Sequence, residues 1–571
     1  MDRRTRPLLS LIAAGAALSV AAVGAMSGGA TAAPKGKPGP PPKPTKVVII
    51  VVDALSKEIV DKYDMQNVEG LMADYVDTPK SYLGHTGSVT VVTHNVITSG
   101  LLPKHTGWTT EGYRDVDHVL PDVKPDNGLS DGLFISSDWD NTMMFPVMEH
   151  YGYPKLADYL DATGDTFTIS PKVYAAYAFG GPGSTSITTF GSVTCPAGGP
   201  NAGLRYRGPV GINVPSYVTS TCGSRYYVAR GPVYDTNKLP ASLYSVADNR
   251  YVTGHDPAHL GGDIWATDMA LDVMDHEDWS GIFVTLPGVD KAAHMWGGVN
   301  DPGPTGANGD PMTHLAFAAA TADAQVGRIM DALEESGELD NTLVVLTADH
   351  GSVSVKTPPD GTNVTDPHFH GTVCAAVDCG FFNWYYGDVE NDVNYNQPQA
   401  ALRPLVATNN LGFSYSDSSL NVWLHDQSAG KVAEAAAIMA NMPDVTAVWR
   451  NDGDHFTRVS PVRYDLMSTK AERQWFDKHA QELVDTQAAN YGPDLIATLP
   501  DNTTYSVAGD HGGIQRAAQQ IPIIFAGAGL SSKDVMAPVR SVDIMPTILK
   551  AMGIAPTYPM DGVGYPLPRA K

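Results

Sequence analysis

The stretch Lys46-Val-Val-Ile-Ile-Val-Val-Asp53 is an unbroken, mostly β-branched run that ends on an acidic residue. A continuous apolar run of this length is typical of a strand buried on both faces, as in a parallel sheet. The runs 281–286, 342–347 and 521–526 have the same character, and residues 313–336 carry apolar side chains at helical spacing. Strand, helix and strand in this order predict an α/β fold with a mostly parallel central sheet flanked by helices and joined by right-handed crossovers.

The composition limits the class of protein. The 571 residues are 43% hydrophobic and 18% charged, which suits a packed core and excludes global disorder. The formal net charge of -24 disfavours binding of nucleic acid or an anionic membrane through bulk electrostatics, so we expect no nucleic-acid-binding module. A small anionic substrate is still compatible with this charge, because bound divalent cations reverse the local field in a carboxylate-rich site.

The N-terminus has the pattern of an export signal. Arg3, Arg4 and Arg6 precede an apolar stretch over residues 8–25, and Ala30-Thr31-Ala32 has the small residues of a cleavage site. The alternative is a membrane anchor, since the run is close to the minimum length that spans a bilayer. The run is rich in Ala and Gly rather than Leu, which favours a signal peptide over residues 1–33. We therefore expect a secreted protein with no stable membrane span and a Pro-rich linker over residues 34–45.

One large domain is expected over residues 46–571, with two regions inserted into it. Residues 110–260 are rich in Gly, Tyr, Ser and Pro and predict a loop-rich insertion. Residues 365–505 predict a small α/β cap, with strands near 420–425 and 445–449 and a helix over 429–442.

The chain has four cysteines, all in the exported part: Cys195, Cys222, Cys374 and Cys379. An even number in an oxidising compartment predicts two disulfides. Local pairing, Cys195 with Cys222 and Cys374 with Cys379, is the simplest of the possible connectivities. Zinc binding through cysteine is the rival interpretation, and the absence of a CxxC pair disfavours it.

Acidic and imidazole side chains follow three of the predicted strands. Asp53 ends the first strand, and Asp349 and His350 follow the strand 342–347. Ligands collect at the carboxyl ends of strands in open α/β sheets, so these side chains are placed for metal or substrate. Asp290 and His294 follow the strand 281–286, and their i, i+4 spacing puts both on one helix face. The alternative roles are helix caps for the aspartates and a surface position for the histidine.

A second Asp-His-Gly tripeptide, Asp510-His511-Gly512, repeats the pattern that begins at Asp349. Each tripeptide alone fits an ordinary loop, but two at strand ends of one sheet are better explained as ligands. Carboxylate beside imidazole suits a borderline cation, so zinc is the preferred metal, and manganese or iron could fill the same ligands.

The segment Ser88-Val-Thr90-Val-Val-Thr-His94-Asn95-Val-Ile-Thr98-Ser99-Gly100-Leu-Leu-Pro103 is dense in hydroxyl groups. A hydroxyl held between two cations ionises near neutral pH, because the metals stabilise the alkoxide. The alternative interpretation is a Thr-rich β segment.

Taken in this order, these residues resemble the alkaline phosphatase superfamily, specifically its nucleotide pyrophosphatase/phosphodiesterase-like branch. The resemblance covers most of the chain, from Asp53 through the segment 88–103 to His511-Gly512-Gly513. It extends to Ser541-Val-Asp-Ile-Met-Pro-Thr547, which is similar to the start of the family's closing helix. It implies an alkaline-phosphatase-like catalytic domain that binds two divalent metal ions.

The resemblance also implies a role for each ligand. One metal would be held by Asp53, Asp349, His350 and the Thr90 hydroxyl, and the other by Asp290, His294 and His511. Thr90 is the implied nucleophile, because Gly100 occupies the glycine position of the family's Thr-Gly-like turn and counting back from it gives Thr90. Thr86, Ser88 and Thr93 are the neighbouring alternatives.

The segment departs from the family pattern in three places. The turn has Ser99 before Gly100 instead of threonine. Val92 and Thr93 stand where the phosphodiesterase-like branch often has Pro and Asn, so the phosphate-binding asparagine is missing or shifted to Asn95. No Cys-x-Pro-x-Arg occurs at the nucleophile, which disfavours the sulfatase branch.

The implied function is a secreted two-metal phosphodiesterase that acts on a small-molecule phosphate ester through a phosphothreonine intermediate. A phosphomonoesterase or phosphonate hydrolase of the same superfamily is the first alternative. A diester is preferred because the sequence shows no further acidic ligand set for a third metal. The second alternative is a non-catalytic binding protein that retains the fold. The sequence fixes neither the leaving group nor the oligomeric state.

Overall fold

The computed structural model describes residues 43–120, 132–135, 141–189, 211–218, 260–296, 299, 314–354, 397–505 and 509–569. The expected signal peptide, most of the expected linker and the four cysteines of the predicted disulfides lie outside these described residues. Within the described part of the chain, no helix combines the length and the apolar character needed to cross a membrane.

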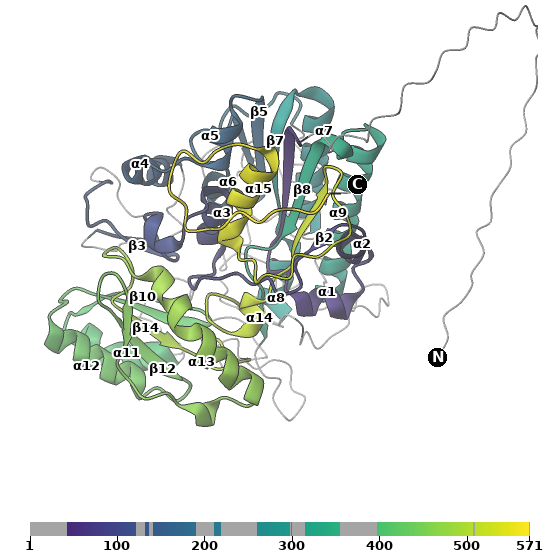
Figure 1. The fold of residues 1–571 in the computed structure, drawn as a ribbon. Helices are drawn as coiled ribbons and strands as arrows, with labels where there is room; N and C mark the ends of the chain where they lie inside the picture. Colours follow the sequence, from purple (N-terminus) through teal and green to yellow (C-terminus); the bar gives the residue numbers. More distant parts are fainter. Residues whose placement is uncertain are drawn as a thin grey trace, which may run out of the picture. The chain divides into compact units, whose positions relative to one another are not determined.

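A seven-stranded sheet lies at the centre of the domain, in the order β2-β16-β8-β1-β7-β5-β6 (Figure 1). Its strands are β1 (Lys46–Val52), β2 (Val76–Asp77), β5 (Asp165–Ser170), β6 (Ser186–Thr189), β7 (Trp279–Leu286), β8 (Thr342–Thr347) and β16 (Ile523–Gly527). β1 pairs in parallel with β7 and β8, and β5 pairs in parallel with β7 and β6. The predicted mostly parallel sheet is therefore confirmed. β16, the last of the predicted strands, pairs antiparallel with both β8 and β2.

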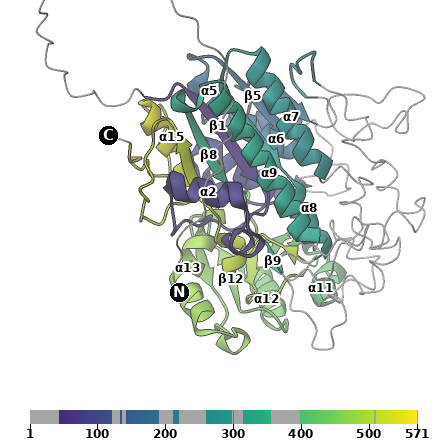
Figure 2. The ribbon, with the colours of Figure 1, turned by 90° about the vertical axis from the view of Figure 1, so that its right-hand side faces the viewer.

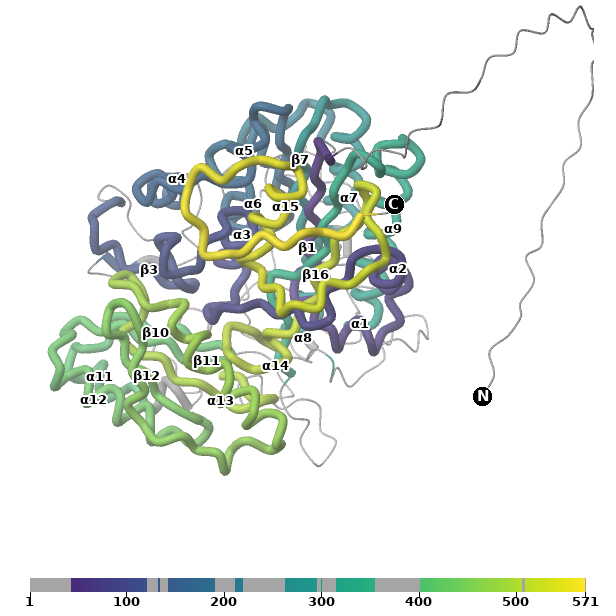
Figure 3. Tube along the Cα trace, in the orientation of Figure 1, coloured from purple at the N-terminus to yellow at the C-terminus, as the bar shows by residue number. Residues whose placement is uncertain are grey.

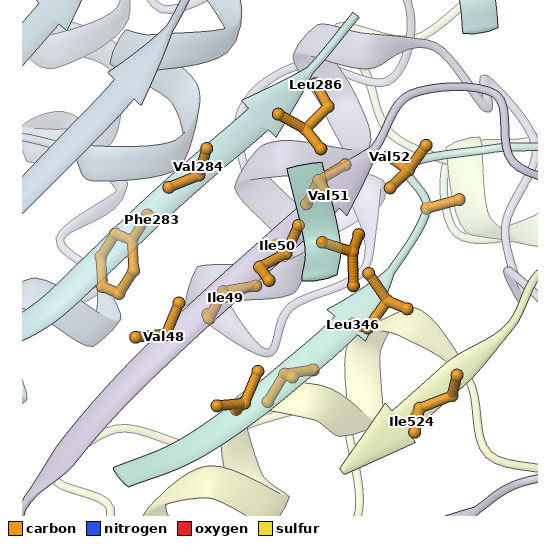
Figure 4. Close-up of a cluster of buried hydrophobic side chains, with 14 of the residues drawn as sticks. Val48, Ile49, Ile50, Val51, Val52, Phe283, Val284, Leu286, Leu346 and Ile524 are labelled. Carbon is orange, nitrogen blue, oxygen red and sulfur yellow. The ribbon is translucent and has the colours of Figure 1, made fainter. Parts of the chain in front are cut away.

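The burial of β1 explains its unbroken apolar sequence. Every residue from Val47 to Val52 has an exposed fraction of 0%. Figure 4 shows the side chains of β1 beside Phe283 of β7, Leu346 of β8 and Ile524 of β16, which belong to the same core cluster. A strand in the middle of a sheet that is covered on both faces has no polar side to alternate with, so the sequence is apolar throughout.

Helices cover both faces of the sheet (Figures 1 and 2). On one face, α3 packs against α5, α6 and α15, and on the other, α9 packs against α2, α7 and α8. The bounds of these and the remaining core helices are α1 (Lys57–Tyr63), α2 (Gln66–Asp74), α3 (Thr90–Ser99), α4 (Asn141–Tyr151), α5 (Leu156–Leu160), α6 (Val173–Gly180), α7 (Leu260–His276), α8 (Gly288–Trp296), α9 (His314–Glu335), α14 (Arg516–Gln519) and α15 (Ile544–Met552). The helix predicted over 313–336 is α9.

Part of the range 110–260, which we expected to be a loop-rich insertion, belongs to the central sheet. β5 and β6 form one end of that sheet, and α6 follows β5 as a crossover helix. The described part of this range also contains a short hairpin of β3 (Gly112–Arg114) and β4 (Leu133–Ile135). Because β5 runs parallel to β7, and β7 to β1 and β8 in turn, the carboxyl end of β5 lies at the same edge of the sheet as the carboxyl ends of those strands.

The described residues of the second predicted insertion form a separate small sheet. Five antiparallel strands lie in the order β10-β11-β14-β12-β13, with bounds β10 (Leu411–Ser416), β11 (Ser419–Leu424), β12 (Ala447–Asn451), β13 (Phe456–Arg458) and β14 (Leu495–Thr498). The helices of this region are α11 (Gln397–Ala407), α12 (Ala429–Ala440) and α13 (Lys470–Val484). β11, β12 and α12 are the elements that the sequence predicted, with ends shifted by a few residues.

The cap sheet and the C-terminal segment both contact the core. Arg114 and Asp494 form an ion pair at 2.8 Å, and the Ser418 N–H donates to the His511 carbonyl at 2.8 Å. After α15 the chain runs back over the core as the yellow trace in Figure 3, where the Asp561 N–H donates to the carbonyl of Gly100 at 3.0 Å. The first two contacts join the cap to the core, and the third joins the C-terminal segment to the end of α3.

Candidate metal centre and active site

The first candidate metal cluster lies at the carboxyl ends of β1 and β8. Asp53 directly follows β1, and Asp349 and His350 follow β8. His350 Nε2 lies 3.6 Å from Asp53 Oδ1 and 3.5 Å from Asp349 Oδ2. Ligand atoms bound to one tetrahedral zinc ion lie about 3.4 Å apart, given bonds of about 2.1 Å. The three atoms thus have the spacing of ligands that share one cation.

Four polar atoms of this cluster have no hydrogen-bond partner among the described residues, and one of them, Asp53 Oδ2, is instead paired with Lys172 Nζ; the other three have no ion-pair contact shorter than 3.5 Å. These three are Asp53 Oδ1, Asp349 Oδ2 and His350 Nε2, all fully buried. Buried polar atoms without a partner are costly unless a ligand satisfies them. Asp349 is otherwise anchored, since its Oδ1 accepts from the Ala54 N–H at 3.2 Å. A divalent cation therefore fits the residues that are present.

Asp53 does not cap a helix. The N-cap of α1 is Ser56, whose hydroxyl accepts from the Ile59 N–H at 3.2 Å. The side chain of Asp53 is left to face His350, which removes the alternative role considered for it.

The second cluster combines α8 with the loop after β15 (Gly509–Asp510). Asp290 Oδ1 lies 3.0 Å from His294 Nε2, and His511 Nε2 lies 3.3 Å from His294 Nε2 and 3.6 Å from Asp290 Oδ1. α8 supplies Asp290 and His294 from one face, as their spacing predicted. β15 pairs with β9 (Val353–Ser354), which brings His511 beside the turn that carries His350.

Backbone carbonyls orient two of the ligand imidazoles. His511 Nδ1 lies 2.9 Å from the Ser88 carbonyl, and His350 Nδ1 lies 3.1 Å from the Gly351 carbonyl. Since a carbonyl only accepts, Nδ1 carries the proton in each ring and Nε2 presents its lone pair to the cluster. Such outer contacts orient metal-binding histidines in general.

The two clusters adjoin each other. The rings of His350 and His511 stack with centroids 3.5 Å apart. Lys172, which follows β5, also joins them, because its Nζ lies 2.5 Å from Asp53 Oδ2 and 2.7 Å from Asp290 Oδ2. Lys172 contacts the Oδ2 atoms, whereas the Oδ1 atoms face the histidines. The ammonium group and two cations can therefore be held by the same carboxylates at once.

Thr90 lies at the junction of the clusters. It is the first residue of α3, and its hydroxyl lies 3.2 Å from Lys172 Nζ. The segment around it is helical, so the alternative of a Thr-rich β segment is wrong. The first N–H groups of a helix lack intrahelical partners and carry partial positive charge, which favours an anion beside Thr90.

The hydroxyls considered as alternatives to Thr90 are engaged elsewhere. Thr86 donates to the Leu483 carbonyl at 2.9 Å, and Ser88 accepts from the Gly512 N–H at 2.9 Å. Thr93 lies 3.3 Å from His85 Nε2. Of these four hydroxyls, the Thr90 hydroxyl is therefore the one that contacts Lys172 between the two candidate clusters.

Asn95 is not placed to bind a phosphate oxygen. Its Nδ2 donates to the Tyr153 hydroxyl at 2.9 Å, and its Oδ1 accepts from Lys155 Nζ at 2.5 Å. Both polar atoms of the amide are thus used within the protein. The sequence allowed Asn95 to take the place of the family's phosphate-binding asparagine, and these contacts disagree with that role.

Burial sets the proton affinity of the first cluster. Burial together with the charges of Asp290 and Asp349 raises the pKa of Asp53 to about 7, and burial raises the pKa of Asp349 to about 6. Burial lowers the pKa of His350 to about 4, so the imidazole is neutral at physiological pH. Divalent cations would stabilise the charged carboxylates and require the neutral imidazole.

Two cationic side chains contact the clusters and were not identified from the sequence: Lys172, and Lys291, whose Nζ lies 2.9 Å from Asp290 Oδ2. Burial alone would lower the pKa of Lys172, but the carboxylates of Asp290 and Asp53 hold it well above its usual range. The signal for it is the alternating run Asp165-Thr-Phe-Thr-Ile-Ser170, which predicts a strand and is followed by Pro171 and Lys172.

A buried carboxylic acid nearby was also missed. Glu111 is 3% exposed, its Oε2 has no hydrogen-bond partner among the described residues, and burial raises its pKa to about 8. The charges of Lys172 and Lys291 oppose this rise in the pKa of Glu111. No pattern in the sequence around Glu111 indicates this position.

A mostly parallel sheet with two histidine and carboxylate clusters at its carboxyl edge agrees with the alkaline phosphatase superfamily of phosphoester hydrolases. Residues 47–370 match the family model described as type I phosphodiesterase / nucleotide pyrophosphatase. The match covers more than half of the chain, and the chain belongs to this family.

Individual relatives are distant. The alkaline phosphatase PhoD of Zymomonas mobilis subsp. mobilis is 22% identical over 541 residues, which cover 89% of this chain and 85% of PhoD. The crystal structure of wild-type alkaline phosphatase PafA superposes with a TM-score of 0.55 at 14% identity, covering 92% of this chain and 98% of PafA. Murine ectonucleotide pyrophosphatase/phosphodiesterase 5 gives a TM-score of 0.47 at 10% identity, covering 90% of this chain and 97% of its own. The PafA likeness supports the fold assignment.

Proposed function

We propose that this protein is a two-metal phosphodiesterase that cleaves small-molecule phosphate esters through a covalent phosphate ester on Thr90. The observation that carries the proposal is the position of the Thr90 hydroxyl, 3.2 Å from the ammonium group that links the two candidate metal clusters. The family assignment supports phosphoester hydrolysis as the reaction class.

The residues of the site have distinct tasks. Asp53, Asp349 and His350, together with the Thr90 hydroxyl, would hold one divalent cation, and Asp290, His294 and His511 the other. When bound, the two ions supply Lewis-acid stabilisation of charge on the attacking and leaving oxygens. We propose zinc for both sites, because each set combines imidazole with carboxylate.

Thr90 attacks phosphorus in line, so that an Oγ1–P bond forms while the bond to the leaving oxygen breaks. The N–H groups at the start of α3 would hold a non-bridging oxygen, and Lys172 would donate to a second one. Water then cleaves the P–Oγ1 bond and regenerates the hydroxyl. For a diester substrate, the products are an alcohol and a phosphate monoester.

A phosphomonoesterase is the second candidate, and Lys172 is the observation that favours it. A monoester carries one more negative charge on its non-bridging oxygens than a diester does. A buried ammonium group beside the nucleophile stabilises that extra charge. The name of the relative PhoD, an alkaline phosphatase, agrees with this candidate.

Replacement of Thr90 tests the mechanism and the binding-protein alternative together. Thr90→Ala should abolish turnover of bis-p-nitrophenyl phosphate and of p-nitrophenyl phosphate, while metal content stays that of the wild type. Acid quenching of the wild type during turnover should give a phosphorylated peptide that contains Thr90. Thr86→Ala is the control, because Thr86 is buried on the same segment but bonds to Leu483 and Gln487. Wild-type turnover by Thr90→Ala would show that Thr90 is not the nucleophile.

We also propose that the protein is exported, because of its basic, apolar and small-residue N-terminal pattern. The mature chain should begin close to residue 33, with its four cysteines paired as Cys195–Cys222 and Cys374–Cys379. N-terminal sequencing and non-reducing peptide mapping of protein from the culture medium test both points. An intact residue 1 or free thiols would contradict them.

A further inference from the structure

Lys155 is a fully buried lysine behind the active site. Its exposed fraction is 0%, and it is among the largest fully buried side chains of the protein. Its Nζ donates to the Asn95 carbonyl at 3.0 Å, to Asn95 Oδ1 at 2.5 Å and to the Ala178 carbonyl at 2.8 Å. All three partners are acceptors, and the three N–H groups of a protonated Nζ would match them one to one.

This position is costly for a lysine. Burial lowers the pKa of Lys155 well below its usual range. The charge of Asp158 opposes this fall in pKa, but among the described residues no carboxylate forms an ion pair with the Lys155 Nζ. An apolar side chain such as methionine would fill the same space without the desolvation cost. The contacts of Nζ therefore call for an explanation other than the filling of the core.

The three contacts join the two helices that carry the reactive groups. Asn95 lies in α3, whose first residue is Thr90, and Ala178 lies in α6, which directly follows Lys172. α3 and α6 pack against each other along their length. A shift of one helix along the other would change the 3.2 Å separation between the Thr90 hydroxyl and Lys172 Nζ. The three hydrogen bonds of Lys155 oppose that shift.

Neighbouring groups hold Asn95 and the Lys155 side chain in the positions that these three hydrogen bonds require. The Asn95 amide also donates to the Tyr153 hydroxyl, which in turn donates to the Thr106 carbonyl at 2.9 Å. Gly181 ends α6 with φ 71°, and a Cβ there would lie 2.6 Å from Lys155 Cγ. The amide cannot rotate without loss of a hydrogen bond, and the lysine stem passes where only glycine leaves room.

We propose that Lys155 is a positioning residue for the reaction: by tying α3 to α6, it sets the distance between the Thr90 hydroxyl and the Lys172 ammonium group. It touches neither substrate nor metal and acts through these two residues. The catalytic part of this inference rests on the proposed function of Thr90 and Lys172.

A double-mutant cycle tests the proposal on the metal-loaded enzyme. Lys155→Met should lower kcat for p-nitrophenyl phosphate by about 10²-fold, with a change in KM of no more than about threefold, since a misplacement of about 1 Å costs that much in rate. In a Lys172→Met background, Lys155→Met should lower kcat by less than about threefold, because the distance that it sets no longer matters. Equal fold-losses in both backgrounds would show a merely structural role and overturn the proposal.

Two further measurements cover folding and the dependence on the proposed function. Lys155→Gln keeps two of the three donors and serves if Lys155→Met does not fold; its loss in kcat should be intermediate and show the same non-additivity. A crystal structure of either variant should show the separation of Thr90 Oγ1 and the position-172 Nζ lengthened from 3.2 Å. An unchanged separation would overturn the proposal even if the wild type hydrolysed neither ester, an outcome that would by itself refute only the proposed function.

Discussion

Replacing Lys172 with methionine separates the two candidate functions. In a near-attack complex, phosphorus lies about 3–3.5 Å from the Thr90 hydroxyl, so non-bridging oxygens come within about 4 Å of Lys172 Nζ. A unit charge at that distance interacts by about 4 kcal/mol at an effective dielectric constant of about 20. A monoester dianion presents one unit more than a diester. Lys172→Met should therefore lower kcat/KM for a monoester by up to about 10³-fold more than for a diester.

The same substitution should strengthen metal binding. The Lys172 ammonium group contacts Asp53 and Asp290, so its removal leaves both carboxylates with more negative charge to offer a cation. Steady-state kinetics with p-nitrophenyl phosphate and bis-p-nitrophenyl phosphate, together with competition titrations against a zinc chelator, measure both effects. Lys431→Met is the control, because Lys431 is paired with Glu434 on an exposed helix face. Equal losses on both esters, or weaker metal binding, would refute the reasoning.

Two predictions concern stability. His85 is buried and its pKa is lowered to about 4, so the unfolded state takes up a proton first as the pH falls below about 6.5. The neutral His85 side chain makes its full contribution to the free energy of unfolding above pH 6.5, and about 2 kcal/mol of that contribution is lost by pH 5. His85→Gln should therefore lower the free energy of unfolding less at pH 5 than at pH 7.5, as measured by urea unfolding. An equal loss of unfolding free energy at pH 5 and at pH 7.5 would contradict the role given to His85. Phe283→Ala should lower the free energy of unfolding by about 3–5 kcal/mol in the same assay, because it opens a cavity between the central sheet and Phe179 of α6. A loss below about 1 kcal/mol would contradict this packing.

The sequence was sufficient to predict the core strands and to place the candidate ligands near their carboxyl ends. β1 and β8 are buried on both faces, so their apolar runs stand out, and the candidate ligands Asp53 and Asp349 lie within two residues of the strand ends. Asp290 and His294 lie on one face of a helix, as their i, i+4 spacing predicted, because both belong to α8. The position of these residues just after predicted strands was enough to predict that they lie close together, because the carboxyl ends of parallel strands share one edge of the sheet.

Features that depend on contacts between segments distant in the sequence could not be predicted in the same way. Lys172 follows β5, which is half polar by sequence and lies in a range whose Gly and Pro content suggested an insertion. The antiparallel direction of β16 is set by its neighbours β8 and β2, which the sequence of a buried strand does not encode. Glu111 and Lys155 are buried polar residues on otherwise unremarkable segments, and only the fold shows what surrounds them.

The metal content of the purified protein, measured by mass spectrometry beside its turnover of the two nitrophenyl esters, tests the central claim most directly. The account predicts about two zinc ions per chain in the wild type, about one after His350→Ala or His511→Ala, and loss of turnover in both variants. A wild type that holds no metal yet hydrolyses either ester, or variants that keep both ions and full activity, would contradict the assignment of the two clusters.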